Sequence, residues 1–165
     1  MIAARRLLLA APLTLAASRL AAQSVWYAVR SADRSFIVDM PGEPVYKVLG
    51  ASHSYSLESG SLSFVAQAAP PPAGADAGDP RRILQGLLDE RAGRLQGGRW
   101  AQSDWRNVQG VTAVESLGSL AAGQTLRQLM ALRDRRLVTL ACLGPADAVR
   151  GRDANRFFAS LRFPS

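Results

Sequence analysis

The 165-residue sequence offers few side chains that could make or break covalent bonds, because it contains one histidine, His53, and one cysteine. A Ser-His-Asp relay built on His53 would need a serine and a carboxylate brought to it from distant parts of the chain. His53 stands among alternating serines, which favours a partly buried structural role beside Tyr55. We therefore expect no catalytic residue, and a hydrolase that uses His53 is kept as an alternative.

Metal and cofactor sites are not indicated by the residue types or their spacing. Cys142 stands in an apolar run, where a free thiol behaves as a small hydrophobic side chain, and one cysteine cannot form a disulfide within the chain. The carboxylates lack ligand spacing, and nucleotide-binding and nucleophile-elbow motifs are absent. We expect no metal and no cofactor. Glu115 is interpreted as a residue that holds a turn at the start of a strand.

Arginines are the other candidates for chemistry. Arg133, Arg135 and Arg136 crowd a predicted hairpin tip, and Arg127 stands on the strand that leads to it. Guanidinium groups bind carboxylates and phosphates in bidentate fashion, so these four residues form a candidate interaction patch for a protein or an anionic envelope component. The alternative interpretation is a solvated turn that resists edge pairing.

Three tryptophans could mark an interface if they were exposed beside arginines, although burial is the default for such side chains. They are Trp26, Trp100 and Trp105. Strand alternation over residues 99–107 predicts that Trp100 and Trp105 lie on opposite faces of the sheet.

The N-terminal segment has the pattern of an export signal. Arg5 and Arg6 precede an apolar run over residues 7–17, and small residues follow at Ala21 and Ala22. A basic start, a short apolar stretch and a small-residue exit are typical of a signal peptide, here residues 1–22, with cleavage after Ala22 or Ser24. We expect a Sec signal, with the twin-arginine route, an uncleaved anchor or an amphipathic N-terminal helix as alternatives. The apolar run is shorter than the roughly 20 residues that a membrane span needs.

Export changes the charge of the working protein. The formal net charge is +7, but three arginines lie within residues 1–22, so the mature chain carries 17 basic and 13 acidic residues. A balance of +4 is ordinary for a soluble surface and does not indicate a nucleic-acid partner. We expect a periplasmic or secreted protein with no transmembrane span in its mature chain.

The first half of the mature chain alternates apolar and polar residues, as strands do. Strands are predicted near residues 25–30, 36–40, 45–49, 51–58 and 61–66, and together they suggest a β-meander with one serine-lined, half-solvated face. Residues 68–79 are rich in Pro, Ala and Gly and predict an exposed loop.

Two helices are expected among further strands. One begins at Asp79-Pro80, as N-cap and first helical residue, and ends at Gly97-Gly98; the other covers residues 148–160. Residues 137–143 are apolar on both faces, which places this strand centrally in the sheet. This order predicts a single α+β domain over residues 23–165, a largely antiparallel sheet packed by two main helices.

Three segments resemble the PsbP-like superfamily of small secreted domains. They are the strand-turn Phe36-Ile37-Val38-Asp39-Met40-Pro41-Gly42-Glu43-Pro44, the middle segment Gln109-Gly110-Val111-Thr112-Ala113-Val114-Glu115, and the closing segment Arg156-Phe157-Phe158-Ala159-Ser160-Leu161-Arg162-Phe163. The likeness covers about residues 25–163, with Leu161 where the family usually has a second Phe. The resemblance implies an α/β/α sandwich. It also implies a non-catalytic interaction module, because most members of the superfamily act in that way.

These observations together predict an exported, non-catalytic binding or accessory module of the bacterial envelope, with an unknown partner. Two alternatives stay open. One is the periplasmic hydrolase that uses His53, and the other is a membrane-surface factor that binds anionic groups through the Arg-rich hairpin.

Overall fold

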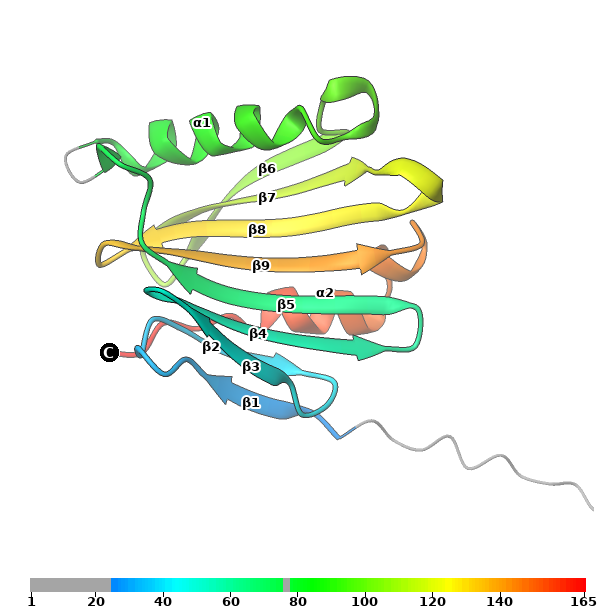
Figure 1. Ribbon diagram of the computed structural model, residues 1–165, viewed down its shortest axis with the longest axis horizontal. Coiled ribbons are helices and arrows are strands. Elements are labelled where there is room, and N and C mark those ends of the chain that lie inside the picture. The colour runs from blue at the N-terminus through cyan, green and yellow to red at the C-terminus, as the bar shows by residue number, and fades with distance from the viewer. Residues whose placement is uncertain (1–24, 76–77) are drawn as a thin grey trace, which may run out of the picture.

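The computed structural model describes residues 25–75 and 78–165, which form two antiparallel sheets and two α-helices (Figure 1). The predicted signal peptide, residues 1–22, lies outside the described residues. Within the described ranges, no helix has the length and apolarity that crossing a membrane requires.

The main sheet has seven strands in the order β3-β4-β5-β9-β8-β7-β6, and every neighbouring pair is antiparallel. Their bounds are β3 Val45–Leu49, β4 Ser52–Ser59, β5 Leu62–Ala69, β6 Gln102–Val108, β7 Val111–Ser119, β8 Thr125–Arg133 and β9 Arg136–Gly144. Two meanders, β3–β5 and β6–β9, join where β5 pairs with β9. The central place of β9 confirms the prediction made from its two apolar faces.

The first two strands leave the predicted meander and form a sheet of their own. β1 (Tyr27–Arg30) pairs only with β2 (Ile37–Met40) in this two-stranded sheet. The other side of β2 meets the chain's C-terminal segment, where Ile37 and Arg162 exchange backbone hydrogen bonds of 2.8 and 2.9 Å. The backbone N–H of Asp39 also donates to Ser160 Oγ at 2.8 Å. The prediction of one continuous meander was therefore wrong, because the second partner of β2 is the C-terminal segment, 121 residues away at the Asp39–Ser160 contact, rather than β3.

The segments that carry the family resemblance meet in space. Beside the contacts of β2 with the C-terminal segment, Arg162 Nη2 lies 3.0 Å from Asp39 Oδ1. The Gln109-Gly110 turn between β6 and β7 reaches the same place, since Gln109 Oε1 accepts a 2.6 Å hydrogen bond from the N–H of Phe163. Gly110 has a φ of 84°, a left-handed conformation that favours glycine. These motifs therefore close the fold rather than form a reactive site.

Each face of the main sheet is covered by a helix. α1 (Pro80–Ala92) packs on β7 and β8, where Leu84 and Leu88 meet Val114 and Met130. The opposite face carries α2 (Arg152–Ala159) and the small sheet, over a larger core that includes Phe64, Leu129, Leu140 and Phe157. Alternation on β8 explains the division, because Met130 points to α1 and Leu129 to α2. The predicted α+β sandwich is confirmed (Figure 1).

The helix boundaries differ from the predicted ones at two places. Asp79 caps α1 by accepting a 3.1 Å hydrogen bond from the N–H of Arg81, as predicted, but the helix ends at Ala92 rather than at Gly97-Gly98. The predicted C-terminal helix is split, because Gly151 is extended between a 3-10 turn, η4 (Ala148–Arg150), and α2. The residues predicted to face the core are buried nonetheless: Val149, Ala154, Phe157, Phe158 and Leu161.

We expect Gly86→Ala to stabilise the protein by about 0.5–1 kcal/mol, because Gly lowers helix stability and a Cβ at this position in α1 would meet no atom within 4 Å. Gly118→Ala is the contrasting control. Its Cβ would stand 2.6 Å from Leu95 Cδ1, so the substitution should overpack this site and destabilise the fold. Urea unfolding midpoints measure both changes. A lower midpoint for Gly86→Ala would mean that this turn of α1 packs against something in solution.

Candidate functional site

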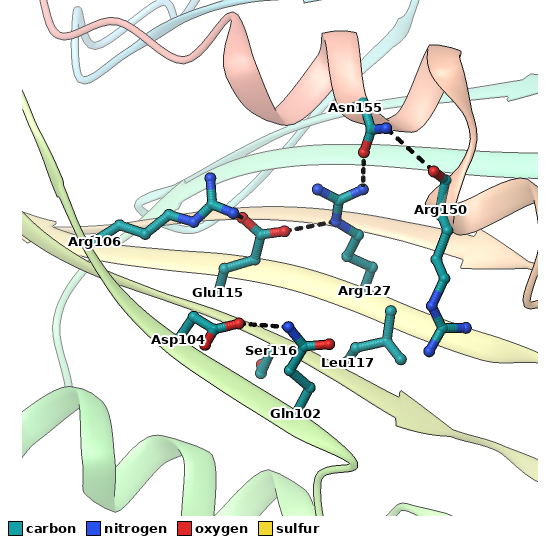
Figure 2. A pocket seen from close by; sticks show the side chains of 9 residues that line it. All are labelled: Gln102, Asp104, Arg106, Glu115, Ser116, Leu117, Arg127, Arg150 and Asn155. Carbon is teal, nitrogen blue, oxygen red and sulfur yellow. Dashed lines mark hydrogen bonds and ion pairs between the residues drawn. The ribbon is translucent and has the colours of Figure 1, made fainter.

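A cavity of about 240 Å³ opens on the α2 side of the main sheet, over β6, β7 and β8 (Figure 2). We call it the arginine cleft. Strand alternation turns Gln102, Asp104 and Arg106 to the same face of β6, while η4 and α2 supply the wall opposite. The lining residues are Gln102, Asp104, Arg106, Glu115, Ser116, Leu117, Arg127, Arg150 and Asn155.

The floor of the arginine cleft is a nearly buried ion pair between β7 and β8. Arg127 Nε donates to Glu115 Oε1 at 2.7 Å, and the two side chains are 12% and 10% exposed. Arg127 Nη1 also donates to Asn155 Oδ1 at 2.6 Å and to the carbonyl of Val149 at 3.1 Å. Its guanidinium carbon lies 4.5 Å from the centroid of the Phe158 ring. These contacts fix Arg127 between the sheet and the α2 layer.

The rim of the arginine cleft is more loosely held. Arg106 Nη2 lies 2.9 Å from Glu115 Oε2, but that oxygen has no hydrogen bond with acceptable geometry, so the contact is electrostatic. Asp104 Oδ2 accepts a 2.6 Å hydrogen bond from Gln102 Nε2. On the opposite wall, Arg150 Nη1 makes a long 3.4 Å contact with the carbonyl of Ala146.

This arrangement can bind charge but lacks the parts of an acid–base relay. Its titratable side chains are arginines and carboxylates, and the buried carboxylate is committed to Arg127. Ser116 belongs to the other face of β7, because it pairs across the ladder with Gln128, whose amide oxygen accepts from Arg91 of α1. The arrangement of charges in the arginine cleft is therefore suited to ionic contacts. In the described ranges, no group of three or more His, Cys, Asp or Glu residues could hold a metal ion.

His53 lies elsewhere, on β4 near the exposed edge strand β3. Its Nδ1 shares a 2.7 Å hydrogen bond with the hydroxyl of Tyr46, and the two rings are stacked with centroids 6.1 Å apart. Tyr46 in turn stacks on Tyr55, whose hydroxyl accepts a 2.8 Å hydrogen bond from the N–H of Ala32. The hydrogen-bond partner of His53 is thus a tyrosine rather than the carboxylate that a relay requires.

The four predicted patch residues do not gather in one place. Arg127 is six residues before Arg133 on β8, which is about 20 Å along a strand, and it belongs to the arginine cleft. Arg133 Nε pairs with Asp134 at 2.9 Å. Arg136 Nε pairs with Asp33 at 3.0 Å, and its Nη1 donates to the carbonyl of Ala51 at 2.9 Å. Arg135 occupies the hairpin turn, with a φ of 57°.

Glu115 is not the turn residue that the sequence predicts, because it lies within a strand. It lies in the middle of β7, opposite Asp104 of β6 and Leu129 of β8, and it is 8% exposed. A signal was available in the sequence, because a carboxylate that follows Val111, Ala113 and Val114 in a strand with buried positions needs a cation on a neighbouring strand. That cation is Arg127, a residue of the predicted hairpin patch.

All three tryptophans are half-buried and pack against a hydrophobic cluster. Trp100 and Trp105 both contact the core beneath α1, so the prediction of opposite faces was wrong, because Trp100 precedes β6 and does not follow its alternation. Trp100 Nε1 donates to the carbonyl of Leu88 at 2.9 Å. Arginines cover the other two rings. The guanidinium carbon of Arg81 lies 4.6 Å from the centroid of the Trp105 ring, and that of Arg156 lies 4.2 Å from the centroid of the Trp26 ring.

Cys142 is fully buried in the core on the α2 side, and burial raises the pKa of its thiol to about 12. Above the ordinary thiol pKa the unfolded chain loses this proton while the folded chain keeps it, so the stability it contributes should fall between about pH 9 and pH 12. We expect Cys142 to resist alkylation at pH 8 in the folded protein and to react at once in urea, as followed by mass spectrometry. Rapid labelling without denaturant would contradict its burial.

The two helix-covered faces, the seven-stranded antiparallel sheet and the added small sheet together define a PsbP-like α+β fold. Among solved structures, the chain is similar to the cyanobacterial PsbP of Synechocystis sp. PCC 6803, with a TM-score of 0.56 and 11% identity over 86% of this chain and 94% of that one. A Pseudomonas aeruginosa protein of unknown function is also similar, with a TM-score of 0.48 and 17% identity over 66% and 88%. No family model matches the sequence, and no curated protein does.

Proposed function

We propose that this chain is an exported, non-catalytic binding or accessory module of the bacterial envelope, and that its binding site is the arginine cleft. The observation that carries the proposal is the floor of that cleft. There Arg127 is fixed by Glu115, Asn155 and the Phe158 ring beneath an open cavity. A fixed charged floor presents groups for recognition, and a committed ion pair is poorly suited to moving protons.

Two further observations support this proposal. The leader-like pattern of residues 1–22 favours a protein that works outside the cytoplasm. The stacked tyrosine environment of His53 favours a structural histidine over a catalytic one. The hairpin alternative is less favoured, because Arg133 and Arg136 are engaged with Asp134 and Asp33 inside the chain.

Photocrosslinking in cells tests the proposal. A photoreactive residue replaces Gln102, which is exposed on the rim of the arginine cleft, or Gln96, an exposed control outside it. We expect an adduct from position 102 alone, on a chain recovered from the exported fraction without its leader. The same adduct from both positions, or a cytosolic chain that keeps its leader, would contradict the proposal.

The non-catalytic part of the proposal is tested by His53→Ala. We expect ester and peptide substrate panels to give no turnover that depends on this residue. A turnover that disappears in His53→Ala, while the variant unfolds at the same urea concentration as the wild type, would establish the hydrolase alternative.

A further inference from the structure

The arginine cleft holds three guanidinium groups and two carboxylates: Arg106, Arg127 and Arg150 against Asp104 and Glu115. At the floor, Arg127 and Glu115 balance each other at 2.7 Å and are both nearly buried. The local charge is therefore set by the three rim residues Arg106, Arg150 and Asp104. Their sum is one positive charge within a concave surface, where the electric field is stronger than over a flat one.

Arg150 is the rim cation without a described anion. Among residues 25–75 and 78–165, no carboxylate lies within 4.0 Å of its guanidinium, and its hydrogen bond to the Ala146 carbonyl is 3.4 Å long. Its backbone is nevertheless anchored, because its own carbonyl accepts a 3.1 Å hydrogen bond from Asn155 Nδ2. Asn155 is in turn bonded to Arg127 of the floor. The backbone of Arg150 is thus fixed, while its guanidinium lines the cavity without a carboxylate partner among the described residues.

Arg106 stands on the other side of the Glu115–Arg127 pair, as Figure 2 shows. It is half exposed, and its 2.9 Å contact with Glu115 Oε2 is not a hydrogen bond. Since Glu115 already accepts from Arg127 through Oε1, Arg106 can turn toward a ligand while Glu115 stays paired. It therefore acts as a second, weaker cation that raises the local potential.

Asp104 limits the charge that the arginine cleft accepts. It shares the exposed face of β6 with Arg106, and its described partner is the neutral amide of Gln102 at 2.6 Å. Because Asp104 offsets one of the two rim arginines, a second negative charge on a ligand would exceed the net positive charge of the rim.

We infer that the arginine cleft binds a singly charged oxyanion, the carboxylate or phosphodiester group of an envelope component, with Arg150 as the main contact and Arg106 as the second cation. This inference rests on the proposed function and names the ligand class of the same site. The planar guanidinium fork of Arg150 matches the paired oxygens of either group.

The inference is tested by titrating the purified protein, as recovered from cells, at constant ionic strength and following its backbone amide NMR signals. The probes are N-acetylglycine, its neutral amide N-acetylglycinamide, glycerophosphoglycerol and the dianion sulfate. We expect N-acetylglycine and glycerophosphoglycerol to shift signals of η4 and β6–β8, and the neutral amide to leave them unchanged. A neutral amide that binds equally well, or two monoanions that shift no cleft signal at tens of millimolar, would overturn the inference.

Matched variants identify the contacts. Arg150→Gln should weaken monoanion binding about five- to tenfold, and Arg106→Gln should weaken it less. Arg152→Gln is the control with the same charge change, since Arg152 is exposed on α2 and does not line the cavity. An equal loss in Arg152→Gln would show general charge attraction and overturn the assignment to Arg150. Asp104→Asn should strengthen sulfate binding, and no change there would remove the single-charge preference.

The two proposals can fail separately. If position 102 gives an adduct in cells but the purified protein binds neither monoanion, the ligand class is ruled out and the proposed binding module stands. If the cleft signals respond to monoanions but the chain stays in the cytosol with its leader, the ligand class stands and export is ruled out.

Discussion

Replacing Arg127 with Ala should lower the free energy of unfolding by about 3–5 kcal/mol, the cost of breaking a buried ion pair from one side. The loss has three parts, because Arg127 neutralises Glu115, donates to Asn155 and the Val149 carbonyl, and covers the Phe158 ring. Glu115, which is 8% exposed in the intact protein, would then keep only the loose contact of Arg106. Urea denaturation followed by tryptophan fluorescence measures the change.

Arg106→Ala is the matched control for this experiment, since it removes a guanidinium from the same carboxylate. Arg106 is 50% exposed and makes no described hydrogen bond, so its loss should change the free energy of unfolding by less than about 1 kcal/mol. Similar losses for the two variants would show that the floor of the arginine cleft is not fixed by Arg127. The arrangement on which the proposed site depends would then be incorrect.

Phe157→Ala should lower the free energy of unfolding by about 3–5 kcal/mol, as removal of a buried aromatic side chain generally does. Phe157 is fully buried on α2 and meets Phe64 of β5 and Phe158 edge-on, with ring centroids 5.2 Å apart in each case. It therefore joins α2 to the main sheet, and the vacated volume would lie between two layers that cannot easily approach.

Tyr27→Ala provides the comparison for the core substitution. Tyr27 is an aromatic residue of β1 that is 43% exposed, so its truncation should change the free energy of unfolding by less than about 1 kcal/mol. Thermal unfolding by circular dichroism ranks the two variants. A decrease in unfolding temperature for Phe157→Ala as small as that for Tyr27→Ala would mean that Phe157 contributes little to the packing of α2 on the main sheet.

Most of the fold could be predicted because the alternation of apolar residues directly reflects which face is buried. Leu62, Phe64 and Ala66 of β5 follow that rule, as does the central placement of β9. The predicted placement of β1 and β2 was wrong because alternation reports faces and not neighbours. Besides β1, the partner of β2 is the segment around Arg162, and no local signal in residues 37–40 specifies it.

The arginine cleft could be predicted only in part. Arg127 and Glu115 stand out in the sequence as parts of a hairpin and of a turn, but their pairing depends on the register of β7 against β8, which the sequence does not reveal. Arg150 and Asn155 were missed, since they reach the cleft through the break at Gly151 between η4 and α2. A site whose residues come from five elements, β6, β7, β8, η4 and α2, has no sequence spacing that a single segment could reveal.

The most direct test is an amide NMR spectrum of the labelled protein titrated with the soluble extract of the envelope. We predict shifts concentrated in β6, β7, β8 and η4, fully reversed by dialysis, with the extract's components recovered unchanged. Shifts confined to His53 and Tyr46 or to the β8–β9 hairpin, or the consumption of a component, would contradict the account of a binding module that acts through the arginine cleft.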